Sequence, residues 1–257
     1  MSLNSVSLIN WILPLLPDCH HYCEPFAGSA AILLNRYPSP VETYNDIDGE
    51  VTNFFRVLRD QKERLIEAIG LTPFSREEFF IAISGSRDNI TDLERARRFF
   101  IRARQTRTGL AQTASLGRWA NCKSASSAGM SGVVSRWLGS ITTLPDVATR
   151  LLRVQIENRL ATEVIKIYDS VNTLFYCDPP YPHQSRRDSK AYSFEMTEQE
   201  HTNLAQVLRQ CTGKVAISGY HCDLMDTLYD GWVVHEAIPK NCHSVKRMRQ
   251  ETLWTNY

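Results

Sequence analysis

Residues 20–48 read HHYCEPFAGSAAILLNRYPSPVETYNDID, and this stretch decides the fold. Residues 20–26 are typical of a strand that runs into a loop, and residues 28–36 are typical of a helix that starts directly at a glycine. Residues 41–48 predict a second strand that ends in acidic residues, and residues 50–70 predict an amphipathic helix. Strand, helix, strand and helix at these lengths predict a parallel α/β sheet.

The same pattern returns in the last third of the chain. After residue 150, short apolar runs again alternate with amphipathic helices. The expected strands are 151–158, 172–178, 214–220, 231–238 and 249–257. The expected helices are 161–170 and 197–211. Thr197 and Glu200 form a capping-box pattern at the start of the second helix. The sheet therefore draws strands from both sides of the middle segment.

The middle segment, residues 72–149, has a different pattern. Apolar residues at helical spacing extend over residues 73–84 and 92–105. Residues 108–132 are rich in Gly, Ser and Ala and have almost no periodicity, which is typical of a mobile loop. We therefore divide the chain into an α/β domain, residues 1–71 and 150–257, and a mostly helical insertion, residues 72–149.

Composition indicates an intracellular globular protein. The 257 residues are 43% hydrophobic and 22% charged, and no apolar run approaches the roughly 18 residues of a membrane span. The first residues lack the pattern of a signal peptide. Seven scattered cysteines without a CxxC pair favour a reducing compartment and do not complete a metal site. We expect no metal and no membrane contact.

Positive charge is concentrated in the middle of the chain. Residues 95–150 contain ten basic residues and one acid, a net charge of +9, which leaves −8 on the rest of a chain whose total is +1. Such a block usually faces a polyanion. The alternative is a solvent-exposed helix face, although such faces normally mix both signs.

Two candidate ligand-binding elements follow the first two strands. In EPFAGSA, residues 24–30, Gly28 and its small neighbours allow a ligand to approach backbone N–H groups near the start of a helix. An acid at the tip of the second strand is where α/β nucleotide sites bind ribose hydroxyls. We choose Asp46 for this role, because Asp48 is better placed as the N-cap of the next helix.

The most specific signal for chemistry is FYCDPPY, residues 175–181. An apolar strand ends here, so that Asp178 is a carboxylate at the end of a buried strand. Pro179 and Pro180 have no backbone N–H groups, and the sheet ladder must therefore stop. Residues 182–194 are polar and basic, which predicts a rigid corner followed by a mobile flap.

EPFAGSA, NDID, a basic insertion and CDPPY, in this order, resemble the Dam-type family of adenine-specific DNA methyltransferases. The resemblance covers nearly the whole chain and includes KVAISGY and ETLWTNY as closing strands. It implies a Rossmann-like sheet of the S-adenosylmethionine-dependent methyltransferases, with the insertion as a target-recognition domain. It also implies transfer of a methyl group from S-adenosylmethionine to the N6 amine of an adenine flipped out of double-stranded DNA.

The resemblance also implies the residues of the site. Asp178 and the Pro179 carbonyl would accept the two N–H bonds of the amine, and Tyr181 would stack on the base. The catalytic residues implied are Asp178, Pro179, Pro180 and Tyr181. The cofactor-binding residues implied are Glu24, Pro25, Phe26, Ala27, Gly28, Ser29, Asp46, Ile47 and Asp178.

The basic block would then bind DNA. Arginines on the helix over residues 92–105 and at its exit fit contacts to phosphates or guanine edges, and the adjacent loop supplies candidates for base readout. The DNA-binding residues that we expect are Arg102, Arg104, Arg107, Arg118, Trp119, Lys123, Arg186 and Arg187. We expect a cytoplasmic monomer, with a dimer as the alternative, in a prokaryotic cell or a phage-infected host, where it serves a restriction-modification system, a phage or housekeeping methylation.

The chain departs from the family's pattern in two places. It begins MSLNSVSLINW, without the glycine-rich turn and lysine that usually precede the first helix, and it has Leu160 where many relatives carry an acid. One alternative is therefore an inactive DNA-binding or cofactor-binding protein. Another is a methyltransferase that acts on an RNA adenine, a cytosine amine or a glutamine amide, because those classes use similar proline corners.

Overall fold

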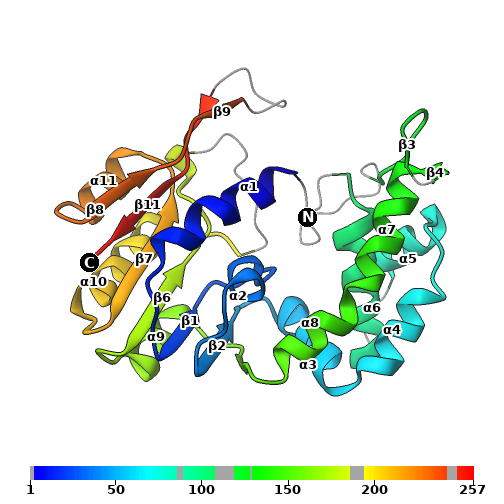
Figure 1. Ribbon diagram of the computed structural model, residues 1–257, viewed down its shortest axis with the longest axis horizontal. Coiled ribbons are helices and arrows are strands. Elements are labelled where there is room, and N and C mark those ends of the chain that lie inside the picture. The colour runs from blue at the N-terminus through cyan, green and yellow to red at the C-terminus, as the bar shows by residue number, and fades with distance from the viewer. Residues whose placement is uncertain (1–2, 86–88, 108–118, 128, 186–193, 242–247) are drawn as a thin grey trace. The chain divides into compact units, whose positions relative to one another are not determined.

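The computed structural model describes residues 3–85, 89–107, 119–127, 129–185, 194–241 and 248–257 (Figure 1). The chain forms two compact units. One comprises Met1–Ile47 and Val154–Tyr257 and is called the sheet unit here. The other comprises Asp48–Arg153 and is called the helical unit.

The sheet unit is built on a seven-stranded sheet of order β5-β2-β1-β6-β7-β11-β8. The first five strands are parallel, and β11 is antiparallel to both of its neighbours, β7 and β8. The bounds in sheet order are β5 Gln155–Glu157, β2 Val41–Asn45, β1 His21–Glu24, β6 Thr173–Cys177, β7 Lys214–Gly219, β11 Thr252–Thr255 and β8 Val233–Glu236. The expected Rossmann-like α/β sheet is confirmed.

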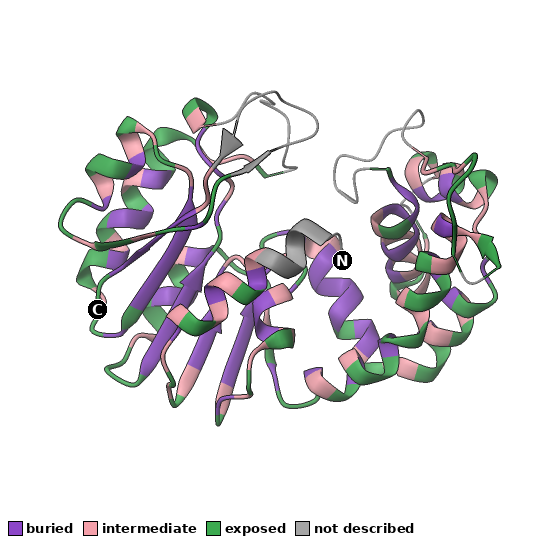
Figure 2. Ribbon diagram, turned by 45° about the horizontal axis from the view of Figure 1, so that its top comes forward, coloured by how far each residue is buried: buried purple, intermediate pink, exposed green. Residues whose placement is uncertain are grey.

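The central strand β6 is buried along its whole length. Its apolar sequence, Leu174 to Cys177, places side chains alternately on the two faces of the sheet. Both faces are covered by other elements, as parallel sheets require. Figure 2 shows the central strands as the buried middle of the unit.

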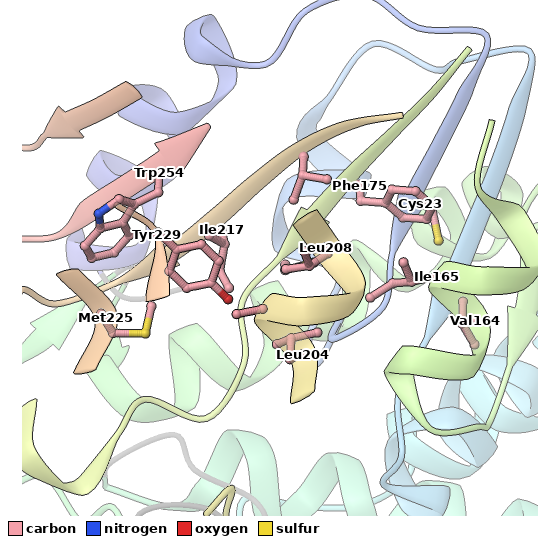
Figure 3. Packing of buried hydrophobic residues seen from close by; sticks show 13 residues of the cluster. Cys23, Val164, Ile165, Phe175, Leu204, Leu208, Ile217, Met225, Tyr229 and Trp254 are labelled. Atoms are coloured by element: carbon pink, nitrogen blue, oxygen red, sulfur yellow. The ribbon is translucent and has the colours of Figure 1, made fainter. Parts of the chain in front are cut away.

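One face of the sheet packs against α9 (Ala161–Tyr168), α10 (Glu198–Gln210) and α11 (Asp223–Leu228). Leu204 and Leu208 of α10 contact a cluster that includes Phe175 and Ile217 from the strands, and Trp254 closes this cluster on the β11 side (Figure 3). The expected capping box at Thr197 and Glu200 starts α10. Burial of this apolar surface holds the strand ends in place.

Further elements complete the sheet unit. The helix α1 (Leu3–Ile12) lies in front of the strands in the view of Figure 1 and continues into the 3-10 turn η1 (Leu13–Leu15). The short helix α2 (Ala31–Asn35) follows β1, and a 3-10 turn, η3 (His183–Ser185), follows β6. A separate two-stranded hairpin is formed by β9 (Lys240–Asn241) and β10 (Met248–Arg249).

The helical unit contains six described helices and one small hairpin. They are α3 Gly49–Asp60, α4 Lys62–Gly70, α5 Arg76–Ser84, α6 Asp92–Gln105, the hairpin β3 Ser126–Ser127 with β4 Met130–Ser131, α7 Gly132–Thr142 and α8 Leu144–Leu151. The central helix α6 packs against α3, α4, α5 and α7. Phe100 of α6 stacks on Phe54 of α3 with ring centroids 5.7 Å apart, and it also contacts Trp137 of α7.

The boundary between the units differs from the expected one. The sequence analysis assigned residues up to 71 to the α/β domain, whereas α3 and α4 belong to the helical unit. The physical reason is the apolar face of α3, where Val51, Phe54 and Phe55 are buried, and this helix packs against α4, α6 and α8. A spacing of apolar residues predicts a buried face but does not say which element covers it.

No helix in the part of the chain that the structure describes is both long and apolar enough to cross a membrane.

A carboxylate links α3 to α6 inside the helical unit. Glu50 accepts hydrogen bonds from Arg95 at 2.8 Å and from Arg102 at 3.2 Å. The Arg102 side chain is only 9% exposed and also donates to the Ala82 carbonyl at 2.8 Å. Because removal of one partner leaves a largely buried guanidinium without its countercharge, this pair is costly to break.

We expect Glu50→Ala to lower the free energy of unfolding by roughly 2–4 kcal/mol. Urea unfolding followed by circular dichroism measures the change. Glu63→Ala is the matched control, because the Glu63 side chain is 83% exposed and pairs with its neighbour Lys62 at the surface. Equal unfolding midpoints for the two variants would contradict a stabilising role for Glu50.

Candidate functional site

Acidic and aromatic residues gather at the edge of the sheet where the parallel strands end. Glu24 ends β1, Asp46 follows β2, Asp178 follows β6 and Tyr220 follows β7. Glu251 precedes β11, and because β11 is antiparallel, its start lies at the same edge. In open α/β sheets, ligands bind outside the carboxyl ends of the strands. This edge is therefore the candidate site.

The loop after β1 is held by residues at the end of β2. Asn45 is fully buried. Its side-chain amide donates to the Pro25 carbonyl at 2.8 Å, and its backbone carbonyl accepts the Ala27 N–H at 2.9 Å. Asp46 Oδ2 accepts the Gly28 N–H at 2.8 Å. Gly28 has φ +48°, a left-handed conformation that suits glycine. Gly28 and Asp46, both expected at the cofactor site, thus lie side by side, and the Asp46 carboxylate is hydrogen-bonded to the loop after β1.

Other expected cofactor residues lie along the same loop and strand end. Ala27 and Pro25 are buried, Phe26 packs partly against the core, and Ser29 is exposed. Ile47 is 43% exposed, so that an apolar side chain stands at the sheet edge next to Asp46. The helix after the loop, α2, has only five residues, so it adds little of the helix-terminus effect that the sequence suggested.

Asp48 acts as the N-cap of α3. Its side chain accepts the Glu50 N–H at 2.9 Å. This is the structural role that the sequence analysis gave it, in contrast to Asp46.

Glu24 is a buried carboxyl group. It is 2% exposed, and its Oε1 accepts the Tyr22 hydroxyl at 2.7 Å. Burial is the largest cause that raises the pKa of Glu24 to about 8. The nearby Asp178 and Glu42 also act to raise this pKa, whereas hydrogen bonds from Tyr22 and the Leu33 N–H act to lower it. Glu24 therefore holds a proton at neutral pH in the folded chain, beside the end of β6.

Asp178 is oriented by the neighbouring strand. The Ser218 hydroxyl of β7 lies 2.7 Å from Asp178 Oδ1 and 3.1 Å from the Cys177 carbonyl. Solvent reaches Asp178, yet the protein around it limits hydration, and this desolvation raises the pKa of Asp178. Hydrogen bonds from Ser218 and Tyr181 act in the opposite direction. The carboxylate can thus accept hydrogen bonds from a ligand while one of its oxygens is fixed.

The two prolines continue the chain beyond the sheet. Pro179 is buried, Pro180 is half-buried, and β6 ends at Cys177 as expected. Because Pro180 has no N–H group, the Pro179–Pro180 amide supplies a carbonyl acceptor and no donor.

Tyr181 packs inside the site rather than on its surface. It is 9% exposed, and its hydroxyl donates to Glu251 Oε2 at 3.1 Å. Its ring lies edge to face against Tyr220, with centroids 4.9 Å apart. Tyr220 in turn donates to Glu251 Oε1 at 2.7 Å. The two tyrosines and the carboxylate form one connected group.

Three residues of this edge were missed by sequence reasoning. Ser218 and Tyr220 stand in KVAISGY, and Glu251 in RQETLWTNY, segments that were identified only as strands. A signal existed for the first two, because residues at the end of the strand that follows the Asp-Pro-Pro corner must lie beside it in a parallel sheet. Glu251 had no such signal, since the antiparallel direction of β11 is not readable from its sequence.

The expected DNA-binding arginines of α6 are largely engaged within the helical unit. Arg97 bonds to Glu78 and Glu94 at 2.8 Å each, which raises the pKa of Arg97. Arg98 also bonds to Glu94, at 2.8 Å. For Arg102, the geometry does not support a DNA contact, because its guanidinium is buried between Ala82 and Glu50. Acids upstream of the basic block thus neutralise part of it.

Other expected contacts remain at the surface. Arg104, Arg107 and Lys123 are exposed, and no ion pair joins them to another residue in the described part of the chain. Trp119 donates to Gln105 at 3.2 Å, and its ring lies under Arg76. Arg118, Arg186 and Arg187 lie outside the described residues, as does most of the expected flap.

The helical unit keeps a positive net charge. By sequence, Asp48–Arg153 contains 17 Lys and Arg residues and 11 Asp and Glu residues, a net charge of +6. The sheet unit carries the remaining −5 of the total of +1. Charge is therefore divided between the units in the direction that the sequence indicated.

Leu160, which stands where many relatives carry an acid, lies at the sheet edge. Leu160 is 53% exposed and precedes α9. Nearby, the Asn158 amide donates to the Asp46 carbonyl at 2.7 Å, so that Asn158 supports the end of β2.

Comparison with known proteins yields a family and several relatives. The family model for D12 class N6 adenine-specific DNA methyltransferases matches residues 6–250. A curated relative, the Type II methyltransferase M1.LlaDCHI of Lactococcus lactis subsp. cremoris, is 24% identical over 285 aligned positions, which cover 97% of this chain and 91% of the relative.

Solved structures were compared as well. The putative methyltransferase yhhF from Escherichia coli is 11% identical with a TM-score of 0.37, and the match covers 99% of this chain and 86% of the other. The rRNA methyltransferase aviRa from Streptomyces viridochromogenes is 11% identical with a TM-score of 0.38, and the match covers 98% of this chain and 83% of the other.

The raised pKa of Glu24 predicts a pH-dependent stability. Between its ordinary pKa of 4.5 and about 8, the unfolded chain loses the Glu24 proton while the folded chain keeps it. The folded state then binds more protons, so the Glu24 contribution to the free energy of unfolding falls as pH rises through this range. Glu24→Gln should remove that part of the decline.

Thermal unfolding at pH 5 and pH 8 measures this effect. We expect the difference in unfolding midpoint between the two pH values to be smaller in Glu24→Gln than in the wild type, with Glu67→Gln on the exposed side of α4 as the control. The same difference in all three proteins would show that Glu24 does not retain its proton.

Proposed function

The chain belongs to the D12 class N6 adenine-specific DNA methyltransferases, and from this premise we propose that its sheet edge binds S-adenosylmethionine and a flipped-out adenine while its helical unit binds double-stranded DNA. The observation that carries the proposal is Asp178 at the end of β6, fixed by Ser218 at 2.7 Å and followed by two prolines and Tyr181. DNA adenine methylation is the activity of the family.

Asp178 and Pro179 act on the amine. An exocyclic adenine amine is a poor nucleophile, because its lone pair is delocalised into the ring. Two acceptors, the Asp178 carboxylate and the Pro179 carbonyl, would draw its N–H bonds aside and direct the lone pair toward the methyl donor. A hydrogen bond to a charged group contributes roughly 1.5–3 kcal/mol. Correct placement of the two reactants contributes up to about 7–11 kcal/mol.

The cofactor fits the residues at the neighbouring strand ends. When bound, S-adenosylmethionine supplies the methyl group from its positively charged sulfonium. The sheet edge carries two acidic residues, Asp46 and Asp178, that complement a cationic ligand, whereas the buried Glu24 lines the same edge in its neutral form. Asp46 would accept hydrogen bonds from the ribose hydroxyls, exposed Ile47 would contact the adenine face, and the Gly28–Ser29 backbone would lie along the methionine part. Asp178 would border both ligands.

Base flipping follows from the position of Asp178. The adenine amine of a duplex is inside the base stack, and an enzyme that acts on it must rotate the nucleotide outward at a cost of a few kcal/mol. Contact with the aromatic residues beside Asp178 would offset roughly 1–3 kcal/mol of this cost. We therefore assign Tyr181 to the target-base site.

The helical unit supplies the charge for DNA binding. Its net charge of +6 favours a polyanion, and Arg104, Arg107 and Lys123 are the described members of the expected set that stand exposed. The relative from Lactococcus lactis is a Type II methyltransferase, which favours a site-specific enzyme of a restriction-modification system for this chain as well.

The first experiment is transfer of labelled methyl groups from S-adenosylmethionine to unmethylated double-stranded DNA. We expect label in N6-methyladenine with the wild type, and a loss of roughly ten- to a hundredfold in kcat for Asp178→Ala, because the charged acceptor that directs the amine is gone. Asp230→Ala, an exposed aspartate elsewhere in the sheet unit, should keep full activity. Retention of activity by Asp178→Ala would refute the assignment.

The proposed contact of Arg104 and Arg107 with DNA is tested separately. We expect Arg104→Gln with Arg107→Gln to weaken duplex binding and to reduce the slope of log K against log salt concentration by about two, since each lost phosphate contact removes about 0.9. The control is Lys166→Gln with Lys214→Gln, two exposed cations of the sheet unit. An unchanged slope for the arginine pair, measured by fluorescence anisotropy, would place the DNA elsewhere.

A further inference from the structure

Glu251 joins two tyrosines beside the catalytic motif. Its Oε1 accepts the Tyr220 hydroxyl at 2.7 Å, and its Oε2 accepts the Tyr181 hydroxyl at 3.1 Å. The two rings are nearly perpendicular, with an interplanar angle of 89°. The Glu251 carboxylate thus joins both phenols, and the Tyr181 hydroxyl also lies within hydrogen-bonding reach of Asp178.

The backbone at Glu251 is held in place by its neighbours in the sheet unit. Thr252 pairs with Gly219 in the antiparallel ladder of β7 and β11, so that Glu251 and Tyr220 are the next opposed residues. The Glu251 carbonyl accepts the Ala237 N–H at 2.9 Å, which ties this position to the segment after β8. Functional groups keep their geometry best when rigid elements support them.

The two tyrosines differ in accessibility. Tyr181 is 9% exposed, whereas Tyr220 is only half-buried. A base that stacks on an aromatic side chain needs an accessible ring face. Tyr181 alone offers little ring surface in this arrangement, and the adjacent Tyr220 offers more.

We propose that Glu251 is a positioning residue of the methyl-transfer site and that Tyr220 is a second aromatic contact of the target adenine, next to Tyr181 and Asp178. This inference rests on the proposed function, because it concerns how the same site receives its base. Without the carboxylate, the phenols lose their common anchor, and the rings can rotate away from the position in which they meet the base.

A double-mutant cycle tests the role of Glu251. Glutamine has nearly the same size, but its amide nitrogen cannot accept a phenol hydrogen. We expect Glu251→Gln to lower kcat/KM for duplex DNA about tenfold in the wild-type background. In the Tyr181→Phe, Tyr220→Phe background, the same substitution should change it less than twofold, because there is no hydroxyl left to hold. An equal loss in both backgrounds would overturn the positioning role.

Tyr220 is tested by comparing two replacements. Phenylalanine keeps the ring and alanine removes it, so a base contact predicts that Tyr220→Ala binds duplex DNA at least fivefold more weakly than Tyr220→Phe. The difference should vanish on a duplex in which the target adenine is replaced by an abasic site, and the affinity for S-adenosylmethionine should not change. Tyr37→Ala is the control, since Tyr37 is 89% exposed. Equal binding by the two Tyr220 variants would overturn the contact.

The outcomes separate this inference from the proposed function. If the wild type transfers no methyl group to DNA, the proposed function fails. The same cycle measured in free energy of unfolding still reports on Glu251, because coupling between Glu251→Gln and the tyrosine substitutions requires the shared hydrogen bonds. Additive unfolding effects would overturn the positioning role even in an active enzyme.

Discussion

The parallel pairing of β6 with β1 and β7 is the constraint on which the site depends. Register aligns Cys23 with Phe175, and Cys177 with Ile217, so the three strands, which end at Glu24, Cys177 and Gly219, end within three residues of one another. The backbone there must stop its ladder at two prolines that cannot donate. As a result, the Glu24, Asp178 and Tyr220 side chains emerge together, and Ser218 meets Asp178 at 2.7 Å. Burial of both sheet faces makes this alignment rigid.

The site holds carboxyl groups in unlike environments at short range. Glu24 is kept protonated by burial, whereas Asp178 retains contact with solvent and with the Ser218 hydroxyl. If both were ionised, their mutual repulsion would oppose folding until a cation neutralised them. Environment, rather than residue type, therefore sets the pKa of each carboxyl group, and the excess negative charge of the site is limited before any ligand binds.

Much of the fold could be predicted from sequence, and parts of the site could not. Alternating apolar runs and a capping box are local signals, and they located the strands, α10 and the corner at Asp178. The basic residues of α6 were misleading, because Glu50 and Glu78, the partners of Arg102 and Arg97, lie far away in sequence. Glu94, which pairs with Arg97 and Arg98, lies just before the basic block. Glu251 was missed because its role depends on strand direction and on two tyrosines brought near by folding. Pairing across the chain is the information that a linear pattern lacks.

The way the helical unit is inserted has an evolutionary consequence. The chain leaves the sheet unit after β2 and returns just before β5, and these two strands are hydrogen-bonded neighbours, with Thr43 opposite Gln155. Continued by one residue, this register places Val154 opposite Glu42, so the exit at Ile47 and the re-entry at Val154 are five residues, or about 17 Å, apart along the strands at 3.3 Å per residue. The entropy of closing such a loop grows slowly with its length. A segment of another size or sequence could replace the helical unit at these two junctions without disturbing the strands, so recombination can exchange one unit while the other is inherited unchanged.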